Sequence, residues 1–202
     1  MTTIYLVRHG ENDFTGKRLV GRTPGVHLNE KGIEQAEAVA KALSTKNIKL
    51  IYTSPLERAY ETALPLSKAL NLPVQPNKGL EEVDFGDWQG YTVQKMRKLE
   101  LFKLAQISPS RMQFPNGESY ASAQERVVDA LLKIASAAGE KTAIACFSHC
   151  DVIRLAVAWV IGMPLDAFHS LTAETGSISV VLLNQRRNML LKLNGLPGDF
   201  QA

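Results

Sequence analysis

The sequence predicts an α/β fold in which helices cover both faces of a mostly parallel central sheet, a three-layer α/β/α sandwich. Short continuous apolar runs, typical of strands buried on both faces, alternate along the chain with longer segments whose apolar residues recur at helical spacing. No fixed-period repeat and no Ser/Gly-rich linker interrupts this order. Residues 1–202 are therefore expected to form a single domain.

Composition and charge exclude several classes of protein. The chain has 202 residues, of which 45% are apolar and 21% charged, as is typical of a globular protein with a sizeable core. Its net charge of +3 is too small to indicate nucleic acid or an anionic membrane as a partner. The longest apolar stretch, residues 155–163, is far too short for a membrane span. Two cysteines and no recognisable secretory signal indicate a cytoplasmic protein.

The first half of the chain predicts two strand–helix units. Residues 4–7 form one buried strand and residues 50–53 a second. A helix is expected after Asn29, because apolar residues recur there at helical spacing. These residues are Ile33, Ala36, Val39, Ala40 and Leu43.

The second helix carries a start signal. Ser54 is the expected N-cap, Pro55 suits the first helical position, and Glu57 would complete a capping box. The helix should continue through an apolar face, with Pro65 kinking or shortening it. That face consists of Ala59, Tyr60, Ala63 and Leu66.

Residues 85–118 are the irregular part of the chain, with a short helix expected near residues 91–104. A helix should follow with an apolar face formed by Tyr120, Ala123, Val127, Leu131 and Ile134. The remaining expected elements are a buried strand at residues 142–147, an apolar helix ended by Gly162 and Pro164, and a hairpin formed by residues 177–183 and 189–193.

Two histidines come directly after predicted strands. His9 follows the first strand, and His149 follows the strand at residues 142–147. Ligands of open parallel sheets bind beyond the carboxyl ends of the strands. Both histidines are therefore expected at one rim of the sheet, where they form a candidate catalytic site.

The chain resembles the histidine phosphatase superfamily, which includes the cofactor-dependent phosphoglycerate mutases. Five blocks carry the resemblance in the family's order over roughly residues 3–160. They are Arg8-His9-Gly10-Glu11, Leu28-Asn29-Glu30-Lys31-Gly32 with Gln35-Ala36, Ser54-Pro55-Leu56-Glu57-Arg58-Ala59 with Thr62-Ala63, Leu80-Glu81-Glu82 with Gly86-Asp87-Trp88-Gln89-Gly90, and Gly117-Glu118-Ser119 with Ser148-His149. The resemblance implies a phosphoglycerate mutase-like fold.

It also implies roles for individual residues. Arg8 and Arg58 would bind phosphate, for which a planar and permanently charged guanidinium is well suited. His9 would be the nucleophile, since a neutral imidazole nitrogen can attack phosphorus near physiological pH, and a backbone carbonyl of the following loop would orient its other nitrogen. His149 would bind the phosphoryl oxygens and stabilise charge in the transition state.

Two adjacent carboxylates compete for the role of general acid. The family's acid is the second residue after the leucine that stands here at Leu80, which selects Glu82 over Glu81. Side chains alternate along an extended segment, so the two carboxylates should point to opposite faces and only one can serve.

The sequence departs from the family at two positions. Thr15 stands where an Asn often contacts phosphate, and Cys150 stands where a Gly usually follows the second histidine. We retain Thr15 and Arg22 as candidate substrate-binding residues, and Glu118 as a further candidate contact.

Two other kinds of site are rejected. Cys146, His149 and Cys150 suggest zinc, but Cys146 lies within a buried strand, and no second ligand pair is evident among the remaining histidines. Residues 10–17 suggest a P-loop, but their spacing is one residue too long, and Arg18 stands where Ser or Thr is required.

The sequence therefore predicts a metal-independent phosphomonoester hydrolase without a cofactor, acting through a phosphohistidine on a small phosphorylated metabolite. A phosphoglycerate mutase-type phosphomutase and a catalytically inactive phosphate-binding protein are the alternatives. The intact set of candidate catalytic residues argues against the inactive protein, and the short segment between Glu82 and Gly117 argues against the mutase. A homodimer is kept as a candidate assembly.

Residues 85–118 are expected to form a flap over the rim that selects the substrate. The segment interleaves basic and apolar side chains, which suits a second anionic group or an amphipathic body on the substrate. An ordinary solvated basic helix, with its apolar side on the core, is the alternative. The side chains in question are Lys95, Arg97, Lys98, Lys103 and Arg111 among Met96, Phe102, Met112 and Phe114.

Overall fold

A six-stranded sheet forms the centre of the molecule. The computed structural model describes residues 1–184 and 187–200. The strands are β1 (Thr2–Arg8), β2 (Ile48–Thr53), β3 (Val74–Pro76), β4 (Ala143–Ser148), β5 (Ile178–Leu183) and β6 (Met189–Gly195). Their order across the sheet is β3-β2-β4-β1-β5-β6. The first four of these strands are parallel, while β5 and β6 add an antiparallel edge.

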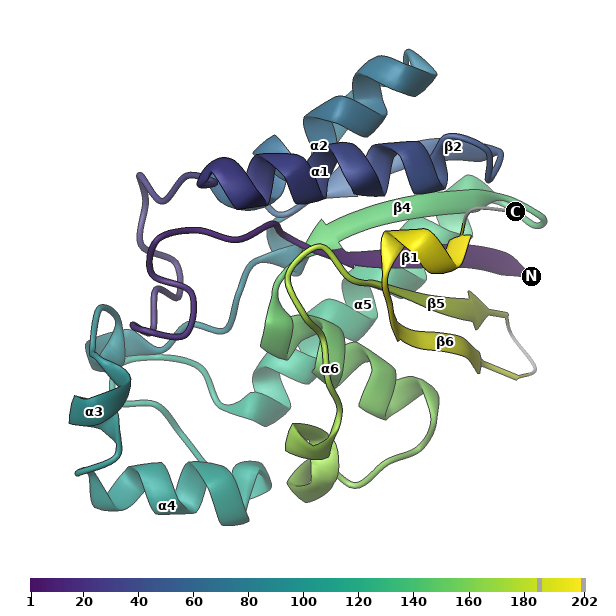
Figure 1. Cartoon of the computed structure of the whole chain (residues 1–202). Helices are drawn as coiled ribbons and strands as arrows, with labels where there is room; N and C mark the ends of the chain where they lie inside the picture. The colour runs from purple at the N-terminus through teal and green to yellow at the C-terminus, as the bar shows by residue number, and fades with distance from the viewer. Residues whose placement is uncertain (185–186, 201–202) are drawn as a thin grey trace.

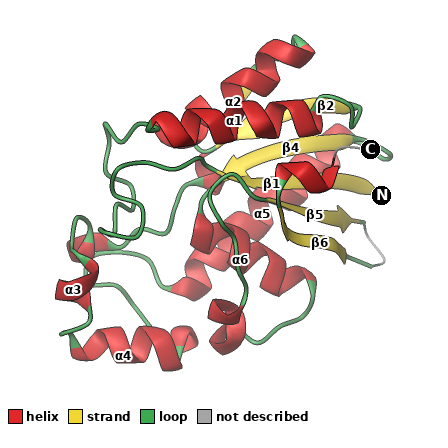
Figure 2. Cartoon of the chain, in the orientation of Figure 1, coloured by secondary structure: helices red, strands yellow, loops and turns green. Residues whose placement is uncertain are grey.

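Helices cover both faces of this sheet, which confirms the predicted α/β class. The longer helices are α1 (Glu30–Leu43), α2 (Glu57–Leu70), α5 (Tyr120–Ala138) and α6 (Cys150–Val160). Figure 1 shows α1 and α2 above the sheet and α5 and α6 below it. Figure 2 shows the same separation of helices, in red, from strands, in yellow.

The core has two parts, one on each face of the sheet. Ile144 and Cys146 of β4 pack in the part covered by α5 and α6, whereas Ala145 and Phe147 pack in the part covered by α1 and α2. Successive side chains of a strand point to opposite faces, so a strand covered on both sides is apolar at every position. This arrangement explains the continuous apolar runs in the sequence.

Helix α1 begins as predicted but buries a slightly different face. Asn29 is its N-cap and accepts a hydrogen bond from the backbone N–H of Gly32. Ile33, which we expected on the buried face, is 55% exposed. Gly32 takes its place, because it packs against the backbone of Glu11.

The predicted start of α2 is wrong. The helix begins at Glu57 with Leu56 as N-cap and no side-chain cap. The backbone N–H of Ser54, which Glu57 would bind in a capping box, donates instead to the carbonyl of Phe147 in β4. Glu57 accepts from the backbone N–H of Gly25. Ser54, directly after β2, is therefore bonded to β4 instead of starting the helix.

Two further expectations about α2 need correction. Pro65 does not shorten the helix, which continues to Leu70. Tyr60, expected on the apolar face, is 37% exposed. A proline removes one backbone donor, and the packing of α2 against α1 and the sheet outweighs that loss.

Residues 85–118 contain two short helices where one was expected. They are α3 (Val93–Met96) and α4 (Glu100–Ile107). Met96, Met112 and Phe114 are buried in the core, so the apolar members of this segment serve mainly in packing. Figure 1 shows α3 and α4 on the side toward which the arrow of β4 points, beyond the carboxyl ends of the parallel strands.

The second half of the chain follows the prediction closely. The expected face of α5 is buried, α6 ends shortly before Gly162, and β5 pairs with β6 as an antiparallel hairpin. Within the predicted turn, residues 185 and 186 lie outside the described residues. None of the helices described is both long enough and apolar enough to pass through a membrane.

Candidate active site

His9 and His149 lie side by side because their strands are neighbours. Strands β1 and β4 pair in parallel with Arg8 opposite Ser148, so the next residue of each strand emerges at the same rim. The backbone N–H of His9 donates to the carbonyl of Ser148 at 3.0 Å. The two imidazole centroids are 5.2 Å apart. The expected rim position of both histidines is confirmed.

Hydrogen bonding determines which nitrogen of His9 is protonated. Nδ1 lies 2.7 Å from the carbonyl oxygen of Gly10. A carbonyl only accepts, so Nδ1 carries the proton and Nε2 carries the lone pair. The Nε–H of Arg58 points at this Nε2 at 3.3 Å. Burial, followed by the charges of Arg58 and Arg8, lowers the pKa of His9 well below its usual value, so the ring is neutral near pH 7.

Arg58 reaches the rim from the first turn of α2. It is only 2% exposed, and its Nη2 donates to the carbonyl of Gly21 at 2.7 Å and lies 3.2 Å from His149 Nδ1. Arg8 donates through Nη1 to the carbonyl of Ala173 at 2.6 Å. Arg58 Nη1 and Arg8 Nε are buried, and neither has an acceptor among the described residues. Two buried guanidinium nitrogens without acceptors indicate a site for an anion.

His149 is fully buried and is held by Ser54 and Arg58. Its Nε2 lies 2.8 Å from Ser54 Oγ. Because Arg58 only donates, Nδ1 of His149 accepts from it and Nε2 carries the proton. Burial, and next the charge of Arg58, lowers the pKa of His149 well below its usual value. Ser54, expected to cap a helix, is therefore a partner of this histidine.

Glu82 and Glu81 occupy different environments, as the expected alternation requires. Glu82 is 8% exposed, and its Oε1 accepts from the backbone N–H of Val83 at 3.0 Å. Burial, and then the charge of Asp151, raises the pKa of Glu82 to about 7, although Arg58 and Arg8 act in the opposite direction. Glu82 can therefore hold or release a proton near neutral pH.

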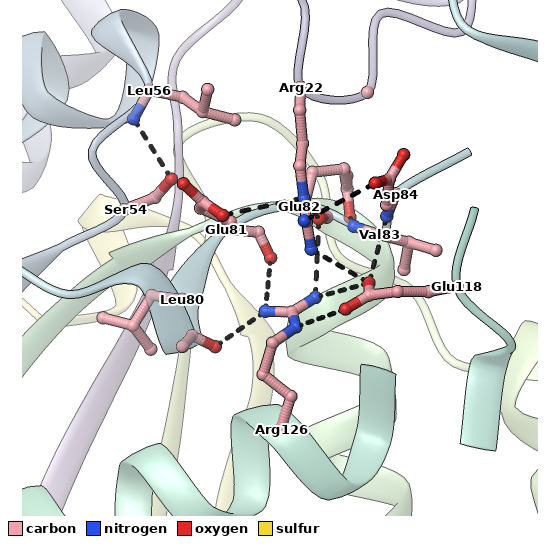
Figure 3. A network of polar contacts seen from close by, with 12 residues as sticks. Arg22, Ser54, Leu56, Leu80, Glu81, Glu82, Val83, Asp84, Glu118 and Arg126 are labelled. Carbon is pink, nitrogen blue, oxygen red and sulfur yellow. Dashed lines mark hydrogen bonds and ion pairs between the residues drawn. The ribbon is translucent and has the colours of Figure 1, made fainter. Parts of the chain in front are cut away.

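Glu81 points instead into a cluster of charged side chains around Arg22, shown in Figure 3. The guanidinium of Arg22 lies 3.7 Å from Glu81, 3.7 Å from Asp84 and 3.0 Å from Glu118. Its Nε donates to the backbone carbonyl of Glu82 at 2.9 Å. The charge of Arg22 is thus balanced by carboxylates of the protein, and its contact with a substrate stays a prediction.

Thr15 and Cys150, the two departures from the family, have partners of their own. Thr15 Oγ1 accepts from the backbone N–H of Asn12 at 3.1 Å, and no hydrogen bond in the described part of the chain joins Thr15 to either histidine. Cys150 Sγ donates to the carbonyl of Ala173 at 3.5 Å. Burial, and then Asp151, raises the pKa of Cys150 to about 11, so it remains a thiol. In residues 1–184 and 187–200, no group of three or more His, Cys, Asp or Glu side chains could hold a metal ion.

Arg126 was missed by the sequence analysis, which treated its helix as core alone. It forms hydrogen bonds with Glu118 and with backbone carbonyls around Glu82 (Figure 3). The signal was present in the sequence: Arg126 lies between the buried residues Ala123 and Val127 of α5, at the border of an apolar face. A charged residue at such a border needs a partner.

Known proteins resemble this chain in sequence and in fold. Residues 4–195 match the sequence profile of the histidine phosphatase superfamily, branch 1. Phosphoserine phosphatase 1 of Hydrogenobacter thermophilus is 34% identical over 199 residues, spanning 96% of this chain and 92% of that protein. Adenosylcobalamin/alpha-ribazole phosphatase of Escherichia coli is 29% identical over 193 residues, spanning 95% of each.

Two further comparisons concern a mutase and a solved structure. The 2,3-bisphosphoglycerate-dependent phosphoglycerate mutase of Thermoplasma acidophilum is 30% identical over 182 residues, spanning 90% of this chain and 87% of that protein. The solved structure of Bacillus stearothermophilus YhfR superimposes with a TM-score of 0.90 at 26% identity, covering 97% of this chain and 98% of that chain.

Proposed function

The chain belongs to the histidine phosphatase superfamily and is a phosphatase, and from this premise we propose that it hydrolyses a small phosphorylated metabolite through a phosphohistidine on His9. One observation carries the proposal. Nε2 of His9 carries an unprotonated lone pair, which faces the Nε–H of Arg58, next to buried guanidinium nitrogens that have no acceptor among the described residues. This arrangement supports His9 as a nucleophile beside a site for a phosphoryl group.

In the first half of the reaction, His9 Nε2 attacks phosphorus and the ester P–O bond breaks. Arg8 and Arg58 hold the phosphoryl oxygens, whose charge is spread over the transition state. Both nitrogens of His149 have partners in the described structure, Ser54 Oγ and Arg58 Nη2, so its direct contact with the phosphoryl group stays a prediction. The protonated carboxyl of Glu82 gives its proton to the leaving oxygen, which departs as an alcohol. The proton on His9 Nδ1 stays on that nitrogen, hydrogen-bonded to the carbonyl of Gly10.

In the second half, the Glu82 carboxylate takes a proton from a water molecule. The water oxygen attacks phosphorus, the P–N bond breaks, and His9 recovers the electron pair on Nε2. Inorganic phosphate leaves, and Glu82 is again protonated for the next turnover. A carboxyl with a pKa of about 7 suits both directions of transfer near neutral pH.

The segment between Glu82 and Gly117 is short, which favours hydrolysis over phosphoryl transfer between substrates. Only 34 residues lie between Glu82 and Gly117. A mutase has to keep water from its phosphoenzyme, and a longer insertion at this place would supply that shield. The mutase relative keeps transfer as the second candidate.

Two guanidinium groups at the phosphate site provide the positive charge that a metal ion supplies in other phosphatases. We therefore propose that turnover requires no divalent metal. The relatives act on chemically different phosphate esters, according to their names, so they support a small metabolite without selecting one.

A panel of phosphorylated metabolites, assayed for released phosphate after exhaustive chelation, tests the proposal. We expect one compound to be hydrolysed far faster than the rest, at the same rate with and without chelator. Phosphate transferred to a second metabolite instead of water would identify a mutase. Binding without release of phosphate would identify an inactive binding protein, and activity restored only by zinc or magnesium would contradict the metal-free mechanism.

A further inference from the structure

The segment that carries Glu82 is held in place by side chains from other parts of the chain. Four consecutive backbone carbonyls, those of residues 79–82, accept hydrogen bonds from side chains. Ser148 Oγ donates to the carbonyl of Leu80 at 2.8 Å. Arg22 Nε donates to the carbonyl of Glu82. The remaining contacts of these carbonyls come from Arg126 (Figure 3).

Arg126 contacts three of the four carbonyls. Its Nη1 donates to the carbonyl of Gly79 at 2.9 Å and to that of Glu81 at 3.0 Å. Its Nη2 lies 3.4 Å from the carbonyl of Glu82. These carbonyls lie at the end of a short 3₁₀ turn, Lys78–Leu80, and just after it, outside the sheet. Their position therefore depends on side chains more than on regular backbone pairing.

Glu118 fixes the orientation of Arg126. Its two carboxylate oxygens accept from Arg126 Nε at 2.8 Å and from Nη2 at 3.0 Å, a bidentate pair. Glu118 Oε2 also accepts from the backbone N–H of Asp84, two residues beyond Glu82. A guanidinium held along one edge by a carboxylate presents its remaining N–H groups in a fixed direction.

We propose that Arg126 is a positioning residue, which holds the backbone of residues 79–82 so that the carboxyl of Glu82 meets the leaving oxygen of the substrate. The inference rests on the proposed function, because it requires Glu82 to be the proton donor. The side chain of Glu82 has one hydrogen bond in the described structure, to the N–H of the adjacent Val83. Its direction is therefore set by the backbone that Arg126 holds.

The test compares leaving groups in single-turnover phosphorylation of the enzyme. An alkyl phosphate needs a proton on its leaving oxygen, whereas an aryl phosphate leaves with little help. The ratio of the alkyl rate to the aryl rate reports how well Glu82 is positioned. It is also independent of the fraction of folded enzyme, so a loss of stability alone does not move it.

We expect Arg126→Gln to lower this ratio by about tenfold to a hundredfold, the scale of a misplaced catalytic group. Arg126→Lys should restore it only in part, because an ammonium keeps the charge but cannot reach Glu118 and three carbonyls together. Lys133→Gln, which removes one positive charge from an exposed position of the same helix, should leave the ratio unchanged. Glu118→Gln should lower the ratio as well, and it replaces Arg126→Gln if that variant does not fold.

Glu82→Gln separates this inference from the proposed function. It should lower the ratio by itself, and adding Arg126→Gln to it should lower the ratio no further, because both changes act through one carboxyl. An unchanged ratio in Glu82→Gln would remove Glu82 as the acid. A lowered ratio in Glu82→Gln together with an unchanged ratio in Arg126→Gln and Glu118→Gln would overturn the role of Arg126 alone.

Discussion

Burial raises the pKa of Glu82 to about 7 and lowers that of His9, so near pH 7 Glu82 is partly protonated and His9 is neutral. The proposed steps require these forms, a carboxyl that gives and takes a proton and an unprotonated nucleophile. The charges of Arg58 and Arg8 lower the pKa of both groups. Desolvation outweighs those arginines at Glu82 and acts with them at His9.

The pH dependence of the two half-reactions follows from these shifts. The rate of phosphorylation by an alkyl phosphate should fall as pH rises through about 7, where Glu82 loses its proton. The rate of dephosphorylation should rise over the same range. Stopped-flow or quench-flow measurement of each step from about pH 5 to pH 9 would show the two opposed limbs. Glu82→Gln should lack both, and an unaltered pH profile in that variant would assign the titration to another group.

The same carboxyl has an effect on stability. In the folded protein the pKa of Glu82 is about 7, above the ordinary value of 4.5. The protonated carboxyl therefore stabilises the folded state fully below pH 4.5, and this stabilisation is lost as pH rises through 7. Glutamine carries no charge that must be buried at high pH. The change in the free energy of unfolding caused by Glu82→Gln should therefore be more favourable at pH 8 than at pH 5, by on the order of 2 kcal/mol. Urea unfolding at both pH values measures this difference. An equal effect at both would show that Glu82 does not titrate differently on folding.

At the level of elements, the loop directly after His9, which contains Gly10 and Glu11, packs tightly against the start of α1. A Cβ on Gly32 would clash with the backbone carbonyl of Glu11, and a Cβ on Gly10 would clash with that of Gly32. Gly32→Ala should therefore separate the loop from the helix, lowering the free energy of unfolding by about 1–3 kcal/mol and reducing kcat. The control is Gly198→Ala, since a Cβ there meets open space. Equal effects of the two substitutions would contradict this packing argument.

A second prediction concerns α3 and the residues directly after it. Lys95 and Lys98 are exposed, and Lys95 Nζ lies 3.2 Å from the centroid of the Tyr91 ring. If this segment contacts the substrate, replacing both lysines by glutamate should raise KM for an anionic substrate and change the order of preference across a metabolite panel. Lys133→Glu on α5 controls for the added charge. An unchanged order would leave α3 with a structural role only.

The sequence predicted those elements that one local pattern determines. Continuous apolar runs identified β1, β2 and β4, and the residues after β1 and β4 placed His9 and His149 at one rim. Features that depend on distant partners were missed. The capping box at Ser54 failed because Phe147 binds the N–H of Ser54, and β3 was overlooked because three residues are too few for a pattern. Arg126 was overlooked because its partners lie in segments about 8 to 47 residues away.

The whole molecule brings three separate segments to one edge of the sheet. The end of β1 and the residue after it provide Arg8 and His9, the junction of β4 and α6 provides His149, and residues 79–82 provide Glu82, the proposed acid. Backbone hydrogen bonds also tie the first loop to the segment preceding α3, since Leu19 and Tyr91 pair at 2.9 Å and Gly90 and Leu19 at 2.7 Å. The loop that follows His9 and the segment that precedes α3 are thus connected directly.

Both half-reactions proposed here depend on transfer of the phosphoryl group to His9. The most direct measurement is to mix the enzyme with an aryl phosphate, quench in base within the first turnover, and map the modified peptide by mass spectrometry. We expect phosphate on His9 that is stable in base and lost in acid, accumulating in Glu82→Gln because its hydrolysis is slowed, and absent from His9→Ala. Phosphate on another residue, turnover retained by His9→Ala, or a bond that is stable in acid and labile in base would contradict a phosphohistidine at His9.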